Sequence, residues 1–217
     1  MREQFQEELD GVSATLVQMA GLVRVAMDNA TTALLTADLT LAEKVIADDT
    51  IIDDMQHELD ARTINLIARQ SPVASDLRTL VTSLRMSADL ERMGDLAHHI
   101  AKSARMRYPA TAVPPELSLT IEEMGRVCSK IIEKVSTVLE KRDADRALEV
   151  EKDDDQIDGL HRKIIQTLLD PNWKHGVETA IDMTLLGRYY ERCADHAVSI
   201  ARRVYFLVTG TYASDKA

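Results

Sequence analysis

Four pairs of acidic residues at a spacing of four are the feature of this chain most able to do chemistry. The pairs are Asp49/Asp53, Glu91/Asp95, Asp154/Asp158 and Glu191/Asp195. A step of four residues puts both carboxylates on one face of a helix, about one turn apart, where their like charges repel. Hard carboxylate oxygens suit Mg²⁺, Mn²⁺ and iron, and a bound cation would offset this repulsion. We therefore predict one cation site from the first two pairs and a second from the last two.

The same pairs show that the sequence is an internal duplication. Residues 91–102 (ERMGDLAHHIAK) and 191–202 (ERCADHAVSIAR) share Glu, Arg, Asp, Ala, Ile and Ala at matching positions, 100 residues apart. The acidic runs 48–53 (DDTIID) and 153–158 (DDDQID) lie upstream of them in the same order. Each half of the chain thus repeats two carboxylate pairs, and two similar sites are expected.

The apolar residues around each pair predict that the carboxylates are partly buried. Glu91 and Asp95 continue a helical line that includes Val81 and Leu84, so they extend an apolar seam. A carboxylate shielded from water must be protonated, paired or bound to a cation. Mg, Mn, Fe and Zn are all candidates, although the scarcity of Cys and His argues against a structural zinc site.

A helical scaffold without metal is the open alternative. Arg92 and Arg192 directly follow the two glutamates and could neutralise a carboxylate within the chain. The acidic pairs would then be solvated helix faces, and the fold would be the same. The two arginines could equally contact the metal ligands without binding the metal themselves, or contact a partner protein.

The composition indicates an all-helical, cytoplasmic protein. Aromatic residues make up 4% of the 217 residues, and there are only 8 Gly and 5 Pro, which favours helices with an aliphatic core. The net charge of -10 argues against a nucleic-acid groove. Cys128 and Cys193 lack metal-ligand spacing and are expected to be reduced core residues. No secretory signal and no apolar run near 18 residues is visible, so no membrane span is expected.

Helix-breaking residues divide the chain into six expected helices. Their approximate ranges are 3–36, 40–69, 71–107, 116–141, 143–169 and 173–209. Thr40 and Glu43 form the pattern of a capping box, and Ser71-Pro72 offers an N-cap and a first-turn proline to the third helix. Long helices joined by short loops pack as antiparallel bundles. We predict an all-α tandem duplication, with three-helix bundles over 1–108 and 116–210, a linker at 109–115 and a flexible tail at 211–217.

Two enzymatic or signalling functions fit parts of the sequence. A ferritin-like di-iron oxidase uses Glu-x-x-His on bundle helices, whereas the nearest patterns here carry aspartate: Asp54-x-x-His57, Asp95-x-x-His98 and Asp158-x-x-His161. A phosphotransfer histidine is suggested by His57-Glu58-Leu59, but no GxxxxGK[ST] phosphate loop accompanies it. No nucleophile–base pair is visible, so we expect a binding protein with no catalytic residues. The roles of these histidines and of His99 stay open.

Five segments together carry a resemblance to a known family. They are DLTLAEKVIADDTIID (38–53), QSPVASDLR (70–78), LERMGDLAHHIAK (90–102), DDDQIDGLH (153–161) and YERCADHAVSIARR (190–203). In order, spacing and duplication the chain resembles the PhoU family, and residues 175–210 are most similar to its actinobacterial branch. Cys193 and Ala194 depart from the apolar residue and glycine usual in the second motif.

The resemblance implies a fold, a site and a role. It implies two similar three-helix bundles, and metal clusters of the kind some members hold on the eight carboxylates named above. It also implies a negative regulator of phosphate uptake and starvation signalling that links a phosphate ABC transporter ATPase with a membrane sensor histidine kinase. We accordingly expect a homodimer that reaches the membrane only through its partners and binds no nucleic acid directly.

Overall fold

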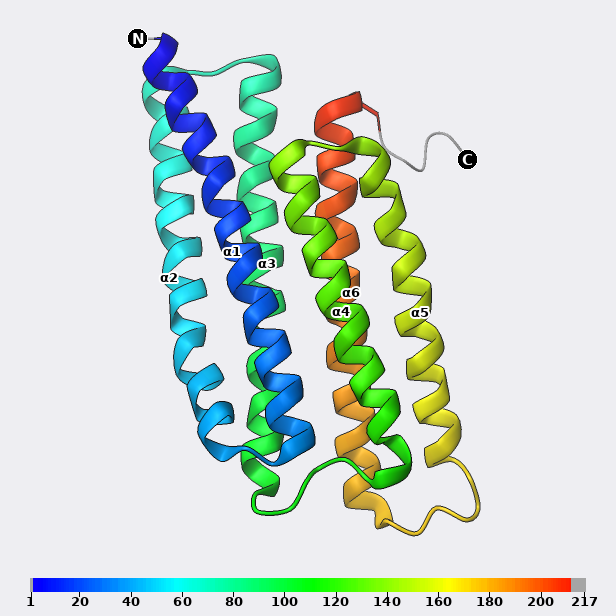
Figure 1. Cartoon of the computed structure of the whole chain (residues 1–217). Helices are drawn as coiled ribbons and strands as arrows, with labels where there is room; N and C mark the ends of the chain where they lie inside the picture. Colours follow the sequence, from blue (N-terminus) through cyan, green and yellow to red (C-terminus); the bar gives the residue numbers. More distant parts are fainter. Residues whose placement is uncertain (1, 212–217) are drawn as a thin grey trace.

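The computed structural model describes residues 2–211, which form six long α-helices and contain no β-strand (Figure 1). The helices are α1 (Arg2–Thr36), α2 (Leu39–Gln70), α3 (Ala74–Arg107), α4 (Pro115–Lys141), α5 (Ala144–Leu168) and α6 (Gly176–Thr209). The predicted all-α class with six helices is therefore confirmed. Only residue 211 of the predicted flexible tail lies within the described residues.

Aspartate side chains begin the second helix of each half. Asp38 accepts a hydrogen bond from the Leu41 backbone N–H over 3.0 Å, and Asp143 accepts one from Arg146 N–H over 3.0 Å. Such N-caps satisfy backbone donors that have no partner within the helix. The predicted capping box at Thr40 is wrong by two residues, because Asp38 caps first and Thr40 already lies inside α2.

Two helix starts also differ from the sequence prediction. Ser71 does not cap α3; it ends α2 in a left-handed conformation (φ 44°), and its N–H donates to the Ile67 carbonyl. Pro72 disfavours right-handed helix at the residue before it, so α2 stops at the proline rather than α3 starting there. The sixth helix begins at Gly176 and not at Trp173, whose indole N–H donates to the Gly176 carbonyl.

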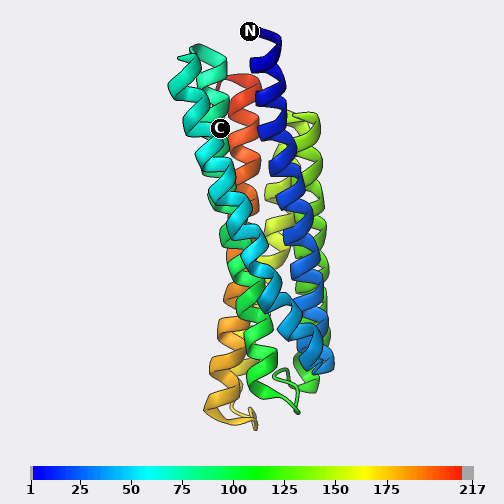
Figure 2. The ribbon, with the colours of Figure 1, turned by 90° about the vertical axis from the view of Figure 1, so that its left-hand side faces the viewer.

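The helices run along one common long axis, and the two halves of the chain lie side by side (Figures 1 and 2). Helices α1, α2 and α3 pack on one another, as do α4, α5 and α6, and the halves meet through α1 with α4 and α3 with α6. One continuous cluster of buried apolar side chains joins all six helices. The boundaries of the predicted bundles, 1–108 and 116–210, stay a prediction.

Helix α1 is more apolar along its length than we expected of any segment from the sequence. Within the described residues, Glu3–Thr36 is the one stretch long and apolar enough to cross a membrane by length and composition. In the structure, however, Leu16, Met19, Val23 and Met27 of α1 are buried in the shared core. A helix buried against its neighbours on an apolar stripe meets the same composition test, because its core face is as apolar as a spanning segment.

A close contact among three helices fixes how the halves meet. Thr31 of α1 donates to the Met27 carbonyl and shares a 2.8 Å hydrogen bond with the buried Tyr190 hydroxyl of α6. A Cβ at Gly125 of α4 would lie 2.5 Å from Thr31 Cγ2, so only glycine fits at this crossing. Burial raises the pKa of Tyr190 above its ordinary value, so its hydroxyl stays protonated even in alkaline solution. The buried Cys128 thiol donates to the Tyr190 carbonyl.

Candidate metal sites

The structure brings the first four predicted carboxylates together between α2 and α3. Asp49 is only 9% exposed, and Asp53, Glu91 and Asp95 are half-buried. Burial, followed by the charges of Asp49 and Asp95, raises the pKa of Asp53. Burial and the charge of Asp95 likewise raise the pKa of Glu91, although Arg92 opposes this shift. The four carboxylates therefore repel one another across the helix pair, as the duplicated spacing predicted.

A histidine that sequence reasoning left without a role completes this group. His98 Nδ1 is hydrogen-bonded to Asp49 Oδ2, while its Nε2 is buried without a hydrogen-bond partner among the described residues. With Asp49 ionised, Nδ1 donates and Nε2 keeps its lone pair, which is how a carboxylate orients a metal-binding imidazole. The only signal in the sequence was its position three residues after Asp95 on the same helical line.

Close packing of α3 on α2 supports this arrangement. A Cβ at Gly94 would lie 3.1 Å from Ile52 Cδ1 and 3.4 Å from Asp49 Oδ1. Glycine therefore lets the backbone of α3 come close to the buried Asp49. At the equivalent position of the second half, Ala194 is fully buried, so a methyl group is accommodated there and the two helix pairs are not identical.

The second four carboxylates meet between α5 and α6. Burial, then the charges of Asp158 and Asp195, raises the pKa of Asp154 to about 6. Burial and the charge of Glu191 also raise the pKa of Asp195. Asp154 Oδ1 is buried and has no hydrogen-bond partner within residues 2–211. Asp154 is thus the least compensated of the predicted ligands in this half.

Glu191, in contrast, has a histidine and an arginine as neighbours. His161 Nδ1 lies 3.1 Å from Glu191 Oε2, and the Arg188 guanidinium contacts the same oxygen. His161 packs over Gly187, where an added Cβ would lie 3.0 Å from its ring. Each cluster therefore has one histidine beside it, but His98 comes from α3 and His161 from α5.

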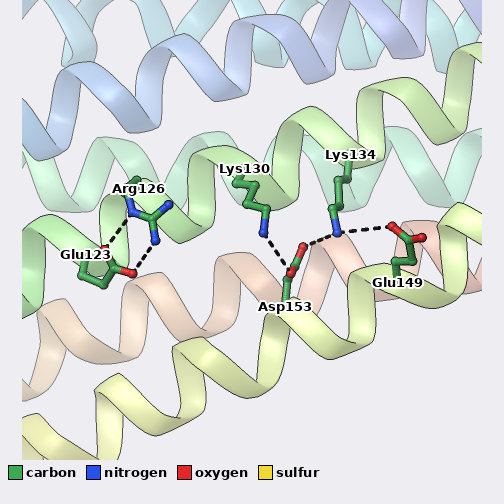
Figure 3. Close-up of polar contacts among 6 residues, drawn as sticks. All are labelled: Glu123, Arg126, Lys130, Lys134, Glu149 and Asp153. Atoms are coloured by element: carbon green, nitrogen blue, oxygen red, sulfur yellow. Dashed lines mark hydrogen bonds and ion pairs between the residues drawn. The ribbon is translucent and has the colours of Figure 1, made fainter.

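The acidic run 153–158 lies on α5, and its side chains contact two different neighbouring helices. Asp153, one residue before Asp154, turns to α4 and lies 3.3 Å from Lys130 Nζ and 2.7 Å from Lys134 Nζ (Figure 3). Burial alone would raise the pKa of Asp153, but hydrogen bonds from Lys134 and Lys130 hold it below its ordinary value. Glu149 pairs with Lys134 in the same row. Asp153 therefore joins α5 to α4 and is separate from the predicted site.

The side chains of the two clusters are of the types that bind a hard cation. Their present arrangement, however, does not form a coordination site. Carboxylate oxygens and the buried lone pair of His98 are suitable ligands for Mg²⁺, Mn²⁺ or iron. Among residues 2–211, however, no group of three or more His, Cys, Asp or Glu side chains converges on a point that could hold a metal ion. Side chains of each cluster would have to turn toward one another to coordinate a cation together.

The other histidine patterns lie away from buried sites. Asp54, His57 and Glu58 are exposed on α2, so the first Asp-x-x-His pattern and the first two residues of the His57-Glu58-Leu59 segment face solvent, while Leu59 is buried in the core. The structure does not bring these side chains into a shielded centre of the kind that di-iron chemistry uses.

A network that the sequence did not indicate joins α3 to α6. Asp89 accepts hydrogen bonds from His196 Nδ1 (3.0 Å), Ser199 Oγ (3.0 Å) and Arg203 Nε (3.2 Å). Burial would raise the pKa of Asp89, but the bonds from His196 and Ser199 hold it below its ordinary value. In the second half, Tyr189 occupies the position that Asp89 occupies in the first. Its ring stacks on His99, with ring centroids 5.3 Å apart.

These contacts relate the two halves by the repeat of 100 residues. Asp89 and Tyr189 occupy equivalent positions, as do their partners Ser199 and His99. Each helix thus contacts the other through the same two repeat positions. A local two-fold relation between α3 and α6 follows, with an ionic contact on one side and an aromatic contact on the other.

Comparison with known proteins extends over nearly the whole chain. The PhoU domain family matches residues 16–104 and 121–204, one stretch in each half. A Mycobacterium bovis protein named phosphate-specific transport system accessory protein PhoU homolog 2 is 45% identical and covers 98% of this chain and 100% of its own. PhoU homolog 1 of Mycobacterium leprae is also 45% identical, over 99% of this chain and 97% of its own.

Solved structures agree with these matches. The crystal structure of PhoU from Pseudomonas aeruginosa superposes with a TM-score of 0.86 at 30% identity, over 95% of this chain and 100% of that one. The PhoU regulatory protein from Streptococcus pneumoniae gives 0.84 at 25% identity, over 96% and 98%. Duplicated acidic motifs, six helices in two halves and full-length matches at 45% identity thus lead to one assignment: the chain belongs to the PhoU family.

Proposed function

We propose that this protein is a cytoplasmic adaptor that represses phosphate uptake and phosphate-starvation signalling when phosphate is plentiful. The observation that carries the proposal is the full-length similarity to relatives named as accessory proteins of a phosphate-specific transport system. Its proposed partners are the ATPase of a phosphate ABC transporter and a sensor histidine kinase. The adaptor acts by binding, without catalytic turnover, and binds no nucleic acid directly.

Exposed apolar side chains support a role in binding two partners. Leu77 and Val81 of α3 are exposed, and so are Val177 and Ile181 at the equivalent positions of α6. Val177 and Ile181 border a groove of about 340 Å³, which is lined mainly by apolar side chains of α5 and α6. Exposed apolar surface of this kind is typical of protein contacts. A second copy of the chain could bind one of these apolar surfaces, and the protein would then be a homodimer.

Cation binding is the second part of the proposal. One cation site is formed by Asp49, Asp53, Glu91 and Asp95, with His98 Nε2 as an added ligand. The other is formed by Asp154, Asp158, Glu191 and Asp195. Burial, followed by mutual repulsion, raises the pKa of several of these groups. This supports the proposal, because a hard cation would offset the repulsion among partly buried carboxylates. Bound cations would neutralise these faces and draw facing helices together.

Deletion of the gene tests the regulatory role. In phosphate-rich medium, a strain without this protein should express phosphate-starvation genes and a reporter under their control, and re-expression of the chain should restore repression. Tagged protein purified from membranes should bring the transporter ATPase and the kinase with it. Continued repression in the deletion strain, with no second PhoU protein present, would count against the proposal.

A further inference from the structure

A basic pocket lies between α3 and α6, where the two halves meet. It has a volume of about 340 Å³ and is lined in part by Arg92, Arg188, Arg192, His99, Tyr189 and His196. We propose that this pocket binds an oxyanion of the phosphate class, either free phosphate or the phosphate group of a small molecule. The proposal goes beyond the adaptor role and does not depend on the identity of the partners.

The charge of the pocket is opposite to that of the protein. The chain has a net charge of -10, yet three of its arginines line one small cavity in which Asp95 is the one lining carboxylate. Glu91 and Glu191 contact two of these arginines from outside the lining, and Arg192 has no such counter-charge within residues 2–211. Guanidinium groups held close together repel one another, and an anion between them removes this repulsion. A pocket of this size lies in the range of small-ligand sites.

Arg192 is the arginine most available to a ligand. Arg92 contacts Asp95 at 2.8 Å and Glu91 at 3.4 Å, and Arg188 contacts Glu191. Arg192 is exposed and has no hydrogen bond or ion pair with any other described residue. A guanidinium presents its N–H donors in a planar fork that matches two oxygens of a phosphate group. Arg192 therefore has a complete set of donors to offer.

The duplication explains why two of the arginines meet. Arg92 and Arg192 occupy the same position of the repeated Glu-Arg motif, and the packing of α3 against α6 brings both to one cavity. Because they come from different halves, a ligand held by both would bridge the halves. The stacked rings of His99 and Tyr189 form part of the wall beside them.

His196 joins the wall of the pocket to the network on Asp89. Its Nδ1 is 3.0 Å from Asp89 Oδ1, so a contact from the first half holds the ring where it lines the pocket.

Titration calorimetry on the full-length chain, freed of metals on a chelating resin, tests the proposal. Inorganic phosphate and phosphoserine are titrated at constant ionic strength, since exposed charges are screened by salt. The variant Arg192→Gln should bind phosphate about tenfold more weakly or worse, because a charge-assisted pair of hydrogen bonds is lost. Arg202→Gln is the matched control, since Arg202 lies on the same helix, is exposed and pairs with Glu151 outside the pocket.

The outcomes separate the alternatives. Tighter binding of inorganic phosphate assigns free phosphate as the ligand, and tighter binding of phosphoserine assigns a phosphorylated small molecule. No binding of either ligand at about 10 mM, a concentration tenfold above a Kd of about 1 mM, would overturn the proposal. So would equal weakening by Arg202→Gln. The reporter strain tests the adaptor role separately, so either proposal can fail alone.

Discussion

Asp89 of α3 and His196 of α6 are joined by a 3.0 Å hydrogen bond between Oδ1 and Nδ1 across the boundary of the two halves. The Asp89 side chain is only 14% exposed, and it also accepts bonds from Ser199 and Arg203. One carboxylate from the first half thus collects three donors from the second. His196 connects this network to the basic pocket.

Asp89→Asn should destabilise the protein at neutral pH. The amide keeps the shape of the side chain but removes the charge from three hydrogen bonds, and we expect a loss of about 1–3 kcal/mol. The folded pKa of Asp89 lies below its ordinary value. Its contribution is therefore present above about pH 4 and is lost as pH falls through the folded pKa.

Urea unfolding at pH 7 and at pH 3–4 measures this effect. The difference between wild type and Asp89→Asn should shrink on acidification. Asp28→Asn, an exposed aspartate on α1, is the control and should change the free energy of unfolding by less than about 0.5 kcal/mol. A difference that stays constant across this pH range would show that the Asp89 charge does not stabilise the α3–α6 contact.

Gly125→Ala should destabilise the junction of α1, α4 and α6. In an exposed helix the same change stabilises by about 1 kcal/mol. Here the new Cβ would lie 2.5 Å from Thr31 Cγ2, and Thr31 is held by bonds to Met27 and Tyr190. We expect a net loss of about 1–3 kcal/mol from overpacking.

Gly159→Ala is the matched control for this prediction. No heavy atom outside its own turn lies within 4 Å of a Cβ at position 159 of α5, so this variant should become more stable. Thermal melts followed by circular dichroism compare the two variants with wild type. If both alanines stabilise the protein, α1 and α4 can separate without loss and the contact is not a constraint on the fold.

Asp154→Asn should stabilise the metal-free protein at pH 7. The pKa of Asp154 is raised to about 6, so the wild-type protein loses stability as pH rises from about 4 to about 6 and stays lower above that range. The amide carries no charge and removes this loss. The gain should be on the order of 1 kcal/mol, since the group is partly exposed and solvent screens its charge.

Thermal melts of chelated protein at pH 4.5 and pH 7 measure this difference. Wild type and Asp154→Asn should differ more at pH 7 than at pH 4.5. Asp155→Asn, on the exposed side of the same run, should have a smaller effect. An Asp154→Asn variant that melts below wild type at pH 7 would mean that an ionised Asp154 is favourably paired.

Cations should raise the melting temperature of wild type more than that of Asp95→Asn/Asp195→Asn. A ligand that binds only the folded form stabilises it by about 2.7 kcal/mol at one hundred times its Kd. Each substitution removes one charge from one cluster at nearly constant size. Melts with Mg²⁺, Mn²⁺ or Fe²⁺, together with elemental analysis, compare the two proteins.

Two controls accompany this measurement. Asp48→Asn removes an exposed charge that is paired with Lys44 beside the first cluster, and it should respond to cations as wild type does. His98→Gln should weaken the response of the first cluster alone, since Nε2 is its proposed nitrogen ligand. If Asp95→Asn/Asp195→Asn gains as much stability as wild type from every cation, these carboxylates do not bind metal.

The sequence by itself determined the features that depend on local order along the chain. Helical periodicity, the scarcity of glycine and proline, and the 100-residue repeat predicted six helices in two similar halves, and the structure has them. The ends of helices were less predictable. At Asp38 and Ser71 several nearby residues can cap or end a helix, and small differences in backbone hydrogen bonding decide among them.

Only the tertiary structure decided which side chains meet across helices. The register predicted that Asp49 and Glu91 face a common space, but not that His98 contacts Asp49 or that Asp153 turns away to α4. It also could not show that Arg92 and Arg192 share one pocket. These contacts depend on how far each helix rotates about its axis and how closely helices approach. Those quantities are set by packing of the shared core, including Gly94 and Gly125, across residues distant in sequence.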